Sequence, residues 1–408
     1  MHKYQTIANA LGVLQNLYQG PIVSQFNDET DAWRGAAQGK FPWQGKAVIR
    51  PLKVRRNQGQ GATSDGGTLP PIGRQQTIEA TIAARYHYLR LGLTGPSIKA
   101  AQSKMAAFVQ MMSFEMEEAY NDAQKEINRA VFWSGRGDLA LVNTAAVGSA
   151  VLVIKGREST EPALKFVDVD GVYDIVTSGG TVEAQGVTVN SISSGDASTS
   201  TATLVLDQAV TVSADSILVR TNSFNLEIQG MLAQLDGATS TVYGIDRSSY
   251  VPTQGNVINL SGEQMTLDFW QRIQDEGERR GGKRKMKAVF VDYATRRMYY
   301  KLLSPDKRFQ NTQQGDGGFS RKDETYLAFN EMPIVADSDC PTRILMVPPE
   351  FLEKYVMPGC EFTFADETGS VMIAEGENDR LEARMRFFAN MFNSKAAGSA
   401  VGYNYVSP

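Results

Sequence analysis

Residues 96–135 read PSIKAAQSKMAAFVQMMSFEMEEAYNDAQKEINRAVFWSG and contain the strongest helix signal in the chain. Pro96 and Ser97 are typical of a helix start, and Gly135 is typical of a helix end. Between them the apolar residues recur every three or four positions, which is the spacing of one helical face. These positions are Ile98, Ala101, Met105, Phe108, Met112, Met116, Ala119, Ala123, Ile127 and Ala130. A helix of this length would reach roughly 55 Å at about 1.5 Å per residue, so we expect a spine across a subunit.

The segment before this helix predicts a long β-hairpin. Residues 46–56 are strand-like, and Pro51 indicates an edge strand. A return strand is expected from Gln75 to Leu93, with one face formed by Ile78, Ala80, Ile82, Ala84, Tyr86 and Tyr88. The intervening NQGQGATSDGGTLPPIG is rich in Gly and Pro. Because an isolated hairpin is only marginally stable in water, something outside the hairpin should hold it.

The rest of the chain changes character several times. After residue 145, Val-, Thr- and Ser-rich strands such as VLVIKG, GVTVNSIS and TATLVL predict a small barrel or sandwich. Alternating helix and strand signals from Leu260 to Met357, including a short helix at PEFLEKYV (349–356), predict an α/β domain. Near the end, Leu381, Ala383, Met385 and Phe387 alternate with charged residues as in a two-faced strand. We therefore divide the chain into an N-terminal arm (1–45), a hairpin (46–95), a spine helix and the start of a sheet domain (96–144), an inserted β module (145–222), an α/β domain (223–375) and a terminal strand (376–408).

Composition excludes several classes of protein. Lys and Arg number 41 against 45 Asp and Glu, for a net charge of −4, which does not favour a dedicated nucleic-acid binder. Two Cys and two His are too few for a zinc ribbon, a disulfide framework or a histidine-rich metal cluster. The amino-terminal residues lack a signal-peptide core, and no stretch approaches the length of a membrane span. We expect a soluble cytoplasmic chain without metal, cofactor or membrane partner.

Few residues could support catalysis. His87 lies in a predicted strand between two tyrosines, where a solvated or interface histidine is the simpler interpretation. We therefore predict no catalytic residues and no enzyme activity. One dense basic patch occurs at residues 279–287 and includes Arg279, Arg280, Lys283, Arg284 and Lys285. It could contact nucleic-acid phosphates nonspecifically, or it could be the solvated end of a helix.

The order of these parts resembles the major capsid proteins of tailed phages with the Hong Kong 97-type fold. That α+β fold consists of an N-arm, an E-loop hairpin, a spine helix, a P-domain sheet and an α/β A-domain. Three strings resemble passages of this family: SGRGDLALV at 134–142, FNLEIQGMLAQLDGATSTVYGIDRSSY at 224–250 and NEMPIVADSDCPTRILMVPPEFLEKYV at 330–356. The resemblance covers nearly the whole chain, although each string alone is a loose pattern.

The resemblance implies a structural shell subunit that assembles as pentamers and hexamers around double-stranded DNA. Scaffolding, portal and decoration proteins are implied as further partners, with assembly in the host cytoplasm and a final place in the virion. The candidate intersubunit contacts are the hairpin arginines Arg55, Arg56, Arg74 and Arg85. Two alternatives stay open: a protein-cargo compartment of the encapsulin type, and an unrelated enzyme or β-rich binding module.

One departure from the family concerns covalent crosslinking. Some relatives join a hairpin lysine to an asparagine of the terminal domain, but no lysine occurs between Val54 and Ile98 here. We therefore predict that no such isopeptide bond forms. The arm is also short for a built-in scaffolding region, which leads us to expect a separate scaffold protein.

Overall fold

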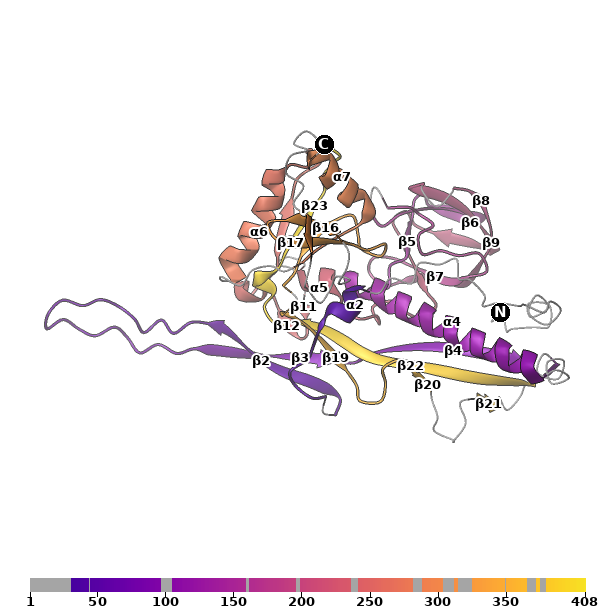
Figure 1. Cartoon of the computed structure of the whole chain (residues 1–408), viewed down its shortest axis with the longest axis horizontal. Helices are drawn as coiled ribbons and strands as arrows, with labels where there is room; N and C mark the ends of the chain where they lie inside the picture. Colours follow the sequence, from indigo (N-terminus) through magenta and orange to yellow (C-terminus); the bar gives the residue numbers. More distant parts are fainter. Residues whose placement is uncertain are drawn as a thin grey trace. The chain divides into compact units, whose positions relative to one another are not determined.

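The computed structural model describes twelve stretches of the chain, which form two compact units. The stretches are residues 31–43, 45–96, 105–158, 161–195, 199–235, 241–281, 288–303, 312–314, 325–348, 350–364, 372–374 and 379–408. Among these residues, unit 1 comprises Ala84–Asn128 and Val356–Ala389, and unit 2 comprises Asp31–Ala83, Arg129–Tyr355 and Asn390–Pro408. Figure 1 shows the elements along the chain.

Unit 1 combines the spine helix with a long two-stranded ladder. Helix α4 runs over Met105–Phe132, and its stripe residues Ala119 and Ile127 are buried. The predicted start of the helix at residues 97–104 lies outside the described residues. Strands β4 (Arg85–Thr94) and β22 (Arg380–Asn393) pair antiparallel over ten residues each, and the short strands β20 (Thr363–Phe364) and β21 (Met372–Ala374) also pair with β22. The predicted terminal strand is therefore confirmed.

Aromatic rings join the spine helix to this sheet. The ring centroid of Phe362 lies 5.5 Å from that of Tyr120 on α4 and 4.4 Å from that of Phe387 on β22. Phe387 belongs to the face that alternation predicts to be apolar, and it is buried. Phe362, which lies outside both periodic segments, thus connects the spine helix to the strand.

The predicted return strand of the hairpin is two strands rather than one. β3 ends at Ala83 and pairs with β2 (Ala47–Arg55), whereas β4 begins at Arg85 and pairs with β22. The phase of burial changes at this break. Tyr86 and Tyr88, expected on the buried face, are 53% and 59% exposed and pack edge-on against the Phe388 ring. Because the chain changes its partner strand at Ala84, the buried and exposed faces of the strand exchange places. The alternation in the sequence alone does not show this exchange.

Six strands in residues 140–220 close into a barrel. The order around the barrel is β10-β5-β6-β9-β8-β7, with its core filled by residues such as Leu152, Ile154 and Leu204. The strands are β5 (Ala140–Val142), β6 (Ala146–Lys155), β7 (Val172–Val176), β8 (Val182–Ser194), β9 (Thr201–Val212) and β10 (Ile217–Arg220). Closure leaves no unpaired edge. That this barrel is an insertion relative to the family fold stays a prediction.

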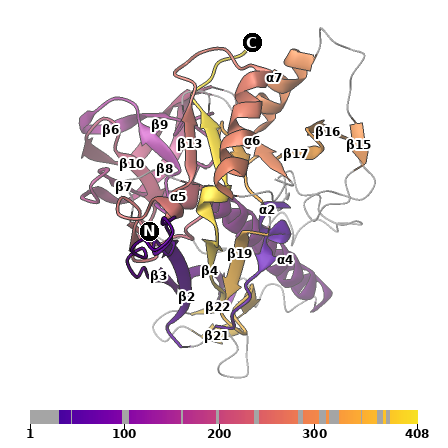
Figure 2. The same ribbon diagram turned by 90° about the vertical axis from the view of Figure 1, so that its left-hand side faces the viewer.

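A mixed sheet with two helices forms the α/β part of unit 2. Among the described residues the strand order is β13-β23-β18-β14-β17-β16-β15. The strands are β13 (Asn256–Asn259), β14 (Val289–Val291), β15 (Thr312–Gln314), β16 (Thr325–Phe329), β17 (Met332–Ala336), β18 (Ile344–Met346) and β23 (Ala400–Tyr403). Helices α6 (Leu267–Gly281) and α7 (Tyr293–Leu303) contribute Phe269, Trp270 and Tyr299 to its core. Figure 2 shows both helices beside this sheet.

The short helix predicted at PEFLEKYV (349–356) is wrong. Leu352–Val356 forms strand β19, which pairs in parallel with β1 (Ala37–Gln38). Leu352, Glu353 and Tyr355 are all buried. Pairing with a neighbouring strand in the buried interior therefore outweighs the local helical pattern of this segment. The smaller elements of unit 2 are α2 (Asp31–Gly35), α5 (Met231–Leu235), β11 (Thr241–Val242), β12 (Ile245–Asp246), η1 (Val251–Thr253) and η3 (Ala396–Gly398).

Candidate functional site

The hairpin carries a long exposed loop. Residues 56–75 connect β2 to β3, and all of them are exposed except the half-buried Gly59, Pro70 and Gly73. Figure 1 shows this loop as the long double trace beyond the two strands. Near its end, Leu69 is 80% exposed and Ile72 is fully exposed at 103%. These two side chains make the loop a candidate surface for a partner.

The base of the hairpin is anchored in the core of unit 2. Val48, Ala80 and Ile82 are buried in one cluster together with Tyr243 and Phe392. The amide of Thr81 donates a hydrogen bond to the Tyr243 carbonyl at 2.9 Å. The expectation that something outside the hairpin holds it is confirmed at this base.

Beside the hairpin base lies a groove of about 670 Å³ that we call the cationic groove. It brings together two predicted groups from distant parts of the sequence: Arg55 and Arg56 at the end of β2, and Arg279 and Arg280 at the end of α6. Lys53, Arg247 and Lys395 also line it. None of the residues that line the groove is acidic, so seven cations share one cavity.

Some of these cations are held in place by uncharged oxygens. The Arg280 guanidinium donates to the Asn256 side-chain oxygen and to the Val251 carbonyl, both at 2.7 Å. The Lys395 ammonium donates to the Gly281 carbonyl. Burial and, next, the neighbouring charge of Arg279 lower the pKa of Arg280 from its ordinary value. Arg279 instead donates to the Glu276 carboxylate at 3.1 and 2.6 Å, so it is already paired with an acidic residue outside the groove lining.

The floor of the groove is apolar. Val242, Tyr243, Ile245 and Phe392 line it and are buried in the same cluster that anchors the hairpin. Because these apolar side chains are already buried, with Val242 6% and Phe392 2% exposed, the groove offers a ligand mainly its cationic side chains.

The other predicted contact residues lie elsewhere. Arg74 is exposed on the hairpin loop, and Arg85 begins β4 in unit 1, where it is half-buried. Neither lines the cationic groove. Lys283, Arg284 and Lys285 of the predicted basic patch lie outside the described residues. Only Arg279 and Arg280 of that patch can be placed, at the end of α6.

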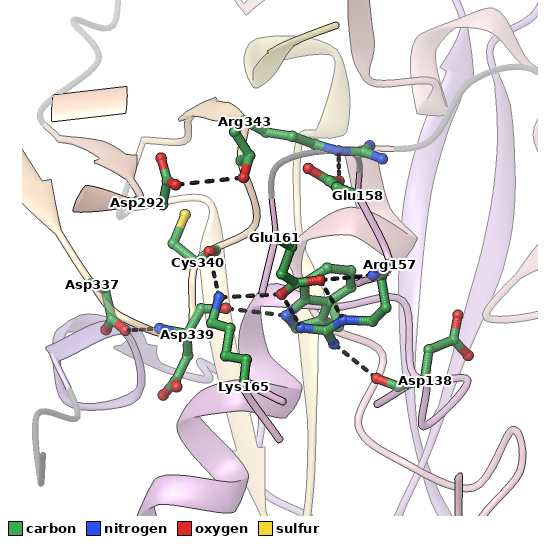
Figure 3. Close-up of polar contacts among 12 residues, drawn as sticks. Asp138, Arg157, Glu158, Glu161, Lys165, Asp292, Asp337, Asp339, Cys340 and Arg343 are labelled. Carbon is green, nitrogen blue, oxygen red and sulfur yellow. Dashed lines mark hydrogen bonds and ion pairs between the residues drawn. The ribbon is translucent and has the colours of Figure 1, made fainter. Parts of the chain in front are cut away.

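A buried ion network that sequence reasoning missed joins the barrel to the α/β part (Figure 3). Arg157 donates to Glu161 through Nε at 3.0 Å and through a terminal nitrogen at 2.6 Å. Lys165 donates to the same carboxylate at 3.2 Å and to the Cys340 carbonyl at 3.3 Å. Arg343 donates to Glu158 at 2.5 Å. The only sequence signal is the four-residue spacing of opposite charges from 157 to 165.

The carboxylates of this network differ in their pKa. Burial raises the pKa of Glu158, despite the opposing effect of Arg343. Burial also works to raise the pKa of Glu161, but the charges and hydrogen bonds of Arg157 and Lys165 outweigh it, and the pKa is lowered. Because each carboxylate is committed to a basic partner, the network is suited to holding the barrel in place rather than to proton transfer.

The remaining candidates for catalysis or metal binding lie where a structural role accounts for them. His87 is half-buried in β4, and its ring lies 6.4 Å from that of Phe387. Nowhere in the described ranges do three or more His, Cys, Asp or Glu side chains gather in a way that could hold a metal ion. The helices that the structure describes include none with the length and hydrophobicity of a bilayer span.

Comparison with known proteins identifies the fold. No family model matches the chain, and no curated protein matches it. A chain of the capsid asymmetric unit of cyanophage A-1(L) matches with a TM-score of 0.56 at 13% identity, covering 95% of each chain. A chain from the capsid of a native GTA particle matches with a TM-score of 0.51 at 9% identity, covering 97% of this chain and 96% of that one.

An encapsulin chain from the holo-SrpI complex of Synechococcus elongatus PCC 7942 gives a TM-score of 0.48 at 6% identity, covering 99% of this chain and 96% of that one. That similarity is too low to support an argument. The two capsid matches span nearly the whole chain, and at their identities they establish fold alone. The chain has an α+β Hong Kong 97-type fold.

Proposed function

We propose that this chain is the major capsid protein of a tailed phage, a structural subunit that assembles as pentamers and hexamers into an icosahedral shell. The observation that carries the proposal is the hairpin loop of residues 56–75, which is anchored at its base and exposed along its length. A chain with the Hong Kong 97-type fold that also exposes Leu69 and Ile72 needs neighbours to cover them.

Shell assembly explains why this loop is long and exposed. A subunit in a shell meets several neighbours, and heterologous contacts that close on themselves generate rings of five or six copies. An extended loop can cross onto a neighbouring copy and bury its apolar side chains there. A chain that worked alone would gain nothing from exposing them.

Packaged double-stranded DNA is the second proposed partner. A net charge of −4 does not favour tight binding, but a container needs only weak and nonspecific contact with its contents. The exposed Arg279 and the basic residues that follow it to Lys287 in the sequence are the candidates for phosphate contact. Separate scaffolding, portal and decoration proteins are proposed as further partners, with assembly in the host cytoplasm and a final place in the virion.

The test is the assembly state of the purified full chain. We expect sedimentation and electron microscopy to show closed shells above a threshold concentration, with scaffold protein added if shells are irregular. Nuclease-protected double-stranded DNA in particles isolated from their source would support the phage assignment, whereas protein cargo without DNA would favour a compartment of the encapsulin type. A monodisperse 44.7 kDa monomer at every concentration, with or without scaffold, would contradict shell function.

A further inference from the structure

One face of the ladder in unit 1 carries a cluster of aromatic rings, Tyr86, Tyr88 and Phe388, that we call the aromatic ridge. Tyr86 and Tyr88 are two residues apart on β4, so they project from the same face. Their ring centroids lie 4.9 and 5.2 Å from that of Phe388, which is opposite Tyr86 in the ladder. Both tyrosines remain more than half exposed, at 53% and 59%. The ridge therefore offers ordered apolar area to a partner.

The spine helix lies against the other face of this ladder. Phe387, the neighbour of Phe388 in β22, contacts the ring of Phe362, which in turn contacts the ring of Tyr120 on α4. Successive side chains of a strand point to opposite faces of the sheet. The aromatic ridge is therefore on the face away from α4, and the helix of its own unit does not cover it.

The charges beside the ridge are already paired. Arg90, two residues after Tyr88, and Arg384, opposite Arg90 in the ladder, both donate hydrogen bonds to Glu382. Single-stranded nucleic acid is bound by aromatic rings together with cations that track its backbone, and here these two cations are committed to a carboxylate. An apolar polypeptide segment is the better match for the ridge.

The same chain exposes such a segment in its hairpin loop. Leu69-Pro70-Pro71-Ile72 belongs to neither helix nor strand. Proline fixes its own φ and drives the residue before it to extended conformations, so this segment favours the polyproline II helix. That helix has three residues per turn, which puts Leu69 and Ile72 on the same side. Their side chains are 80% and 103% exposed.

Polyproline II segments bind aromatic surfaces in other proteins because they are already ordered before they bind. One turn of this helix advances about 9 Å. Tyr86 and Tyr88 are about 7 Å apart along β4, so Leu69 and Ile72 can flank the two tyrosine rings while the prolines lie on them.

The position of the loop on β3 favours a second copy as its source. The eight residues of β3 span about 26 Å and hold the loop at the end of the strand remote from Ala84, after which β4 begins. The loop of another copy can approach the ridge without folding back along its own strands.

We infer that the Leu69–Ile72 segment of one copy packs on the aromatic ridge of a second copy. The inference rests on the proposed shell function and names the surface that receives the loop. Because the segment and the ridge are different surfaces, the contact is heterologous and repeats from copy to copy.

Crosslinking between singly labelled chains tests the contact directly. One chain carries Ile72→Cys and the other Tyr88→Cys, both with Cys360→Ser, while Cys340 is fully buried. After assembly of a 1:1 mixture, we expect a short bis-maleimide to join two chains, with the link between positions 72 and 88 identified by mass spectrometry. The matched control replaces Ile72→Cys by Val147→Cys, at an 82% exposed position on the barrel, and should give no link to position 88.

The threshold concentration for assembly gives a second measurement. We expect Tyr86→Ser with Tyr88→Ser to raise it by about tenfold or more, and Tyr86→Phe with Tyr88→Phe, which keeps the rings, to stay within about threefold of wild type. Combining the serine ridge variant with Leu69→Ser and Ile72→Ser should cost little more than either double variant alone, because both remove the same contact. Circular dichroism and urea unfolding confirm that each variant is folded before assembly.

The outcomes separate this contact from shell function. If the wild type assembles and the serine ridge variant has the same threshold, the ridge is not a contact, but shell function stands. If the effects of the loop and ridge variants multiply in full, the two surfaces meet different partners and the inference is overturned. The same holds if the mixture assembles but positions 72 and 88 are not linked, or if the ridge variant is impaired only when scaffold protein is present. A wild-type chain that stays monomeric at every concentration contradicts both proposals.

Discussion

At the scale of single residues, Glu382 shows how ion pairs hold strands β4 and β22 of unit 1 together. Its carboxylate accepts hydrogen bonds from Arg90 at 2.7 Å, through two nitrogens, and from Arg384 at 2.8 Å. The hydrogen bonds of Arg90 lower the pKa of Glu382 to about 2, although burial works in the opposite direction. Arg90 projects from β4 and Glu382 from β22, so the pair connects the two strands directly.

We predict that Glu382→Gln lowers the free energy of unfolding by about 1–2 kcal/mol at pH 7, a value reduced for the exposure of the two arginines. A carboxylate whose pKa is lowered by folding stabilises the protein above its ordinary pKa of 4.5, and this contribution disappears as pH falls through about 2. Urea unfolding of unassembled wild type and variant at several pH values measures the difference, which should shrink below pH 4.

The control is Glu361→Gln, an exposed residue of the same unit that pairs with no residue in the described part of the chain. It should leave stability unchanged within about 0.5 kcal/mol. An equal loss in both variants, or a loss in Glu382→Gln that persists at pH 2, would show that the carboxylate charge is not the cause.

At the scale of elements, the two ends of the hairpin differ in how much they contribute to the core. Its base contributes buried side chains to the core of unit 2, whereas its loop contributes almost none. Substitutions at the two ends of the same hairpin should therefore have different consequences.

We predict that Leu69→Ser with Ile72→Ser leaves the unfolding transition of the unassembled chain within about 0.5 kcal/mol of wild type, because both side chains are already exposed. The same double variant should raise the threshold concentration for assembly, since it removes apolar surface that a neighbour would cover. Chemical unfolding and light scattering measure the two effects.

The contrasting variant is Ile82→Ser at the fully buried base of the hairpin. It should lower the free energy of unfolding by about 2–5 kcal/mol, because a methyl-rich side chain in a packed core is replaced by a polar one. If the loop variant assembles with the same threshold as wild type, the loop is not an assembly surface.

At the scale of the whole molecule, we predict that the proposed shell is held by noncovalent contacts. No lysine occurs between Val54 and Ile98, and arginine guanidinium groups do not replace a lysine amine in amide formation. We predict that mature particles boiled in detergent run as single 44.7 kDa chains on a gel. A ladder of dimers and higher multiples, with an isopeptide identified by mass spectrometry, would contradict this.

Elements that depend on neighbours in the sequence could be predicted from the sequence. The helix at Met105–Phe132, the strand at Arg380–Asn393, helix α7 and the strands of the barrel follow local periodicity, which is a property of adjacent residues. The exposed loop followed from its Gly and Pro content. Arg55 and Arg56 as intersubunit contacts, and Arg279 and Arg280 as part of a DNA-facing or solvated basic patch, stay predictions.

Pairing between distant segments was decided only by the tertiary structure. The break at Ala84, the strand at Leu352–Val356 and the closure of the barrel each depend on a partner strand that is remote in sequence or on the order in which strands meet. The same holds for the cationic groove, where β2 and α6 bring their arginines together across more than two hundred residues. A local pattern specifies which face of an element is apolar or charged, but the energy that selects the partner for that face comes from contacts that exist only after the chain has folded.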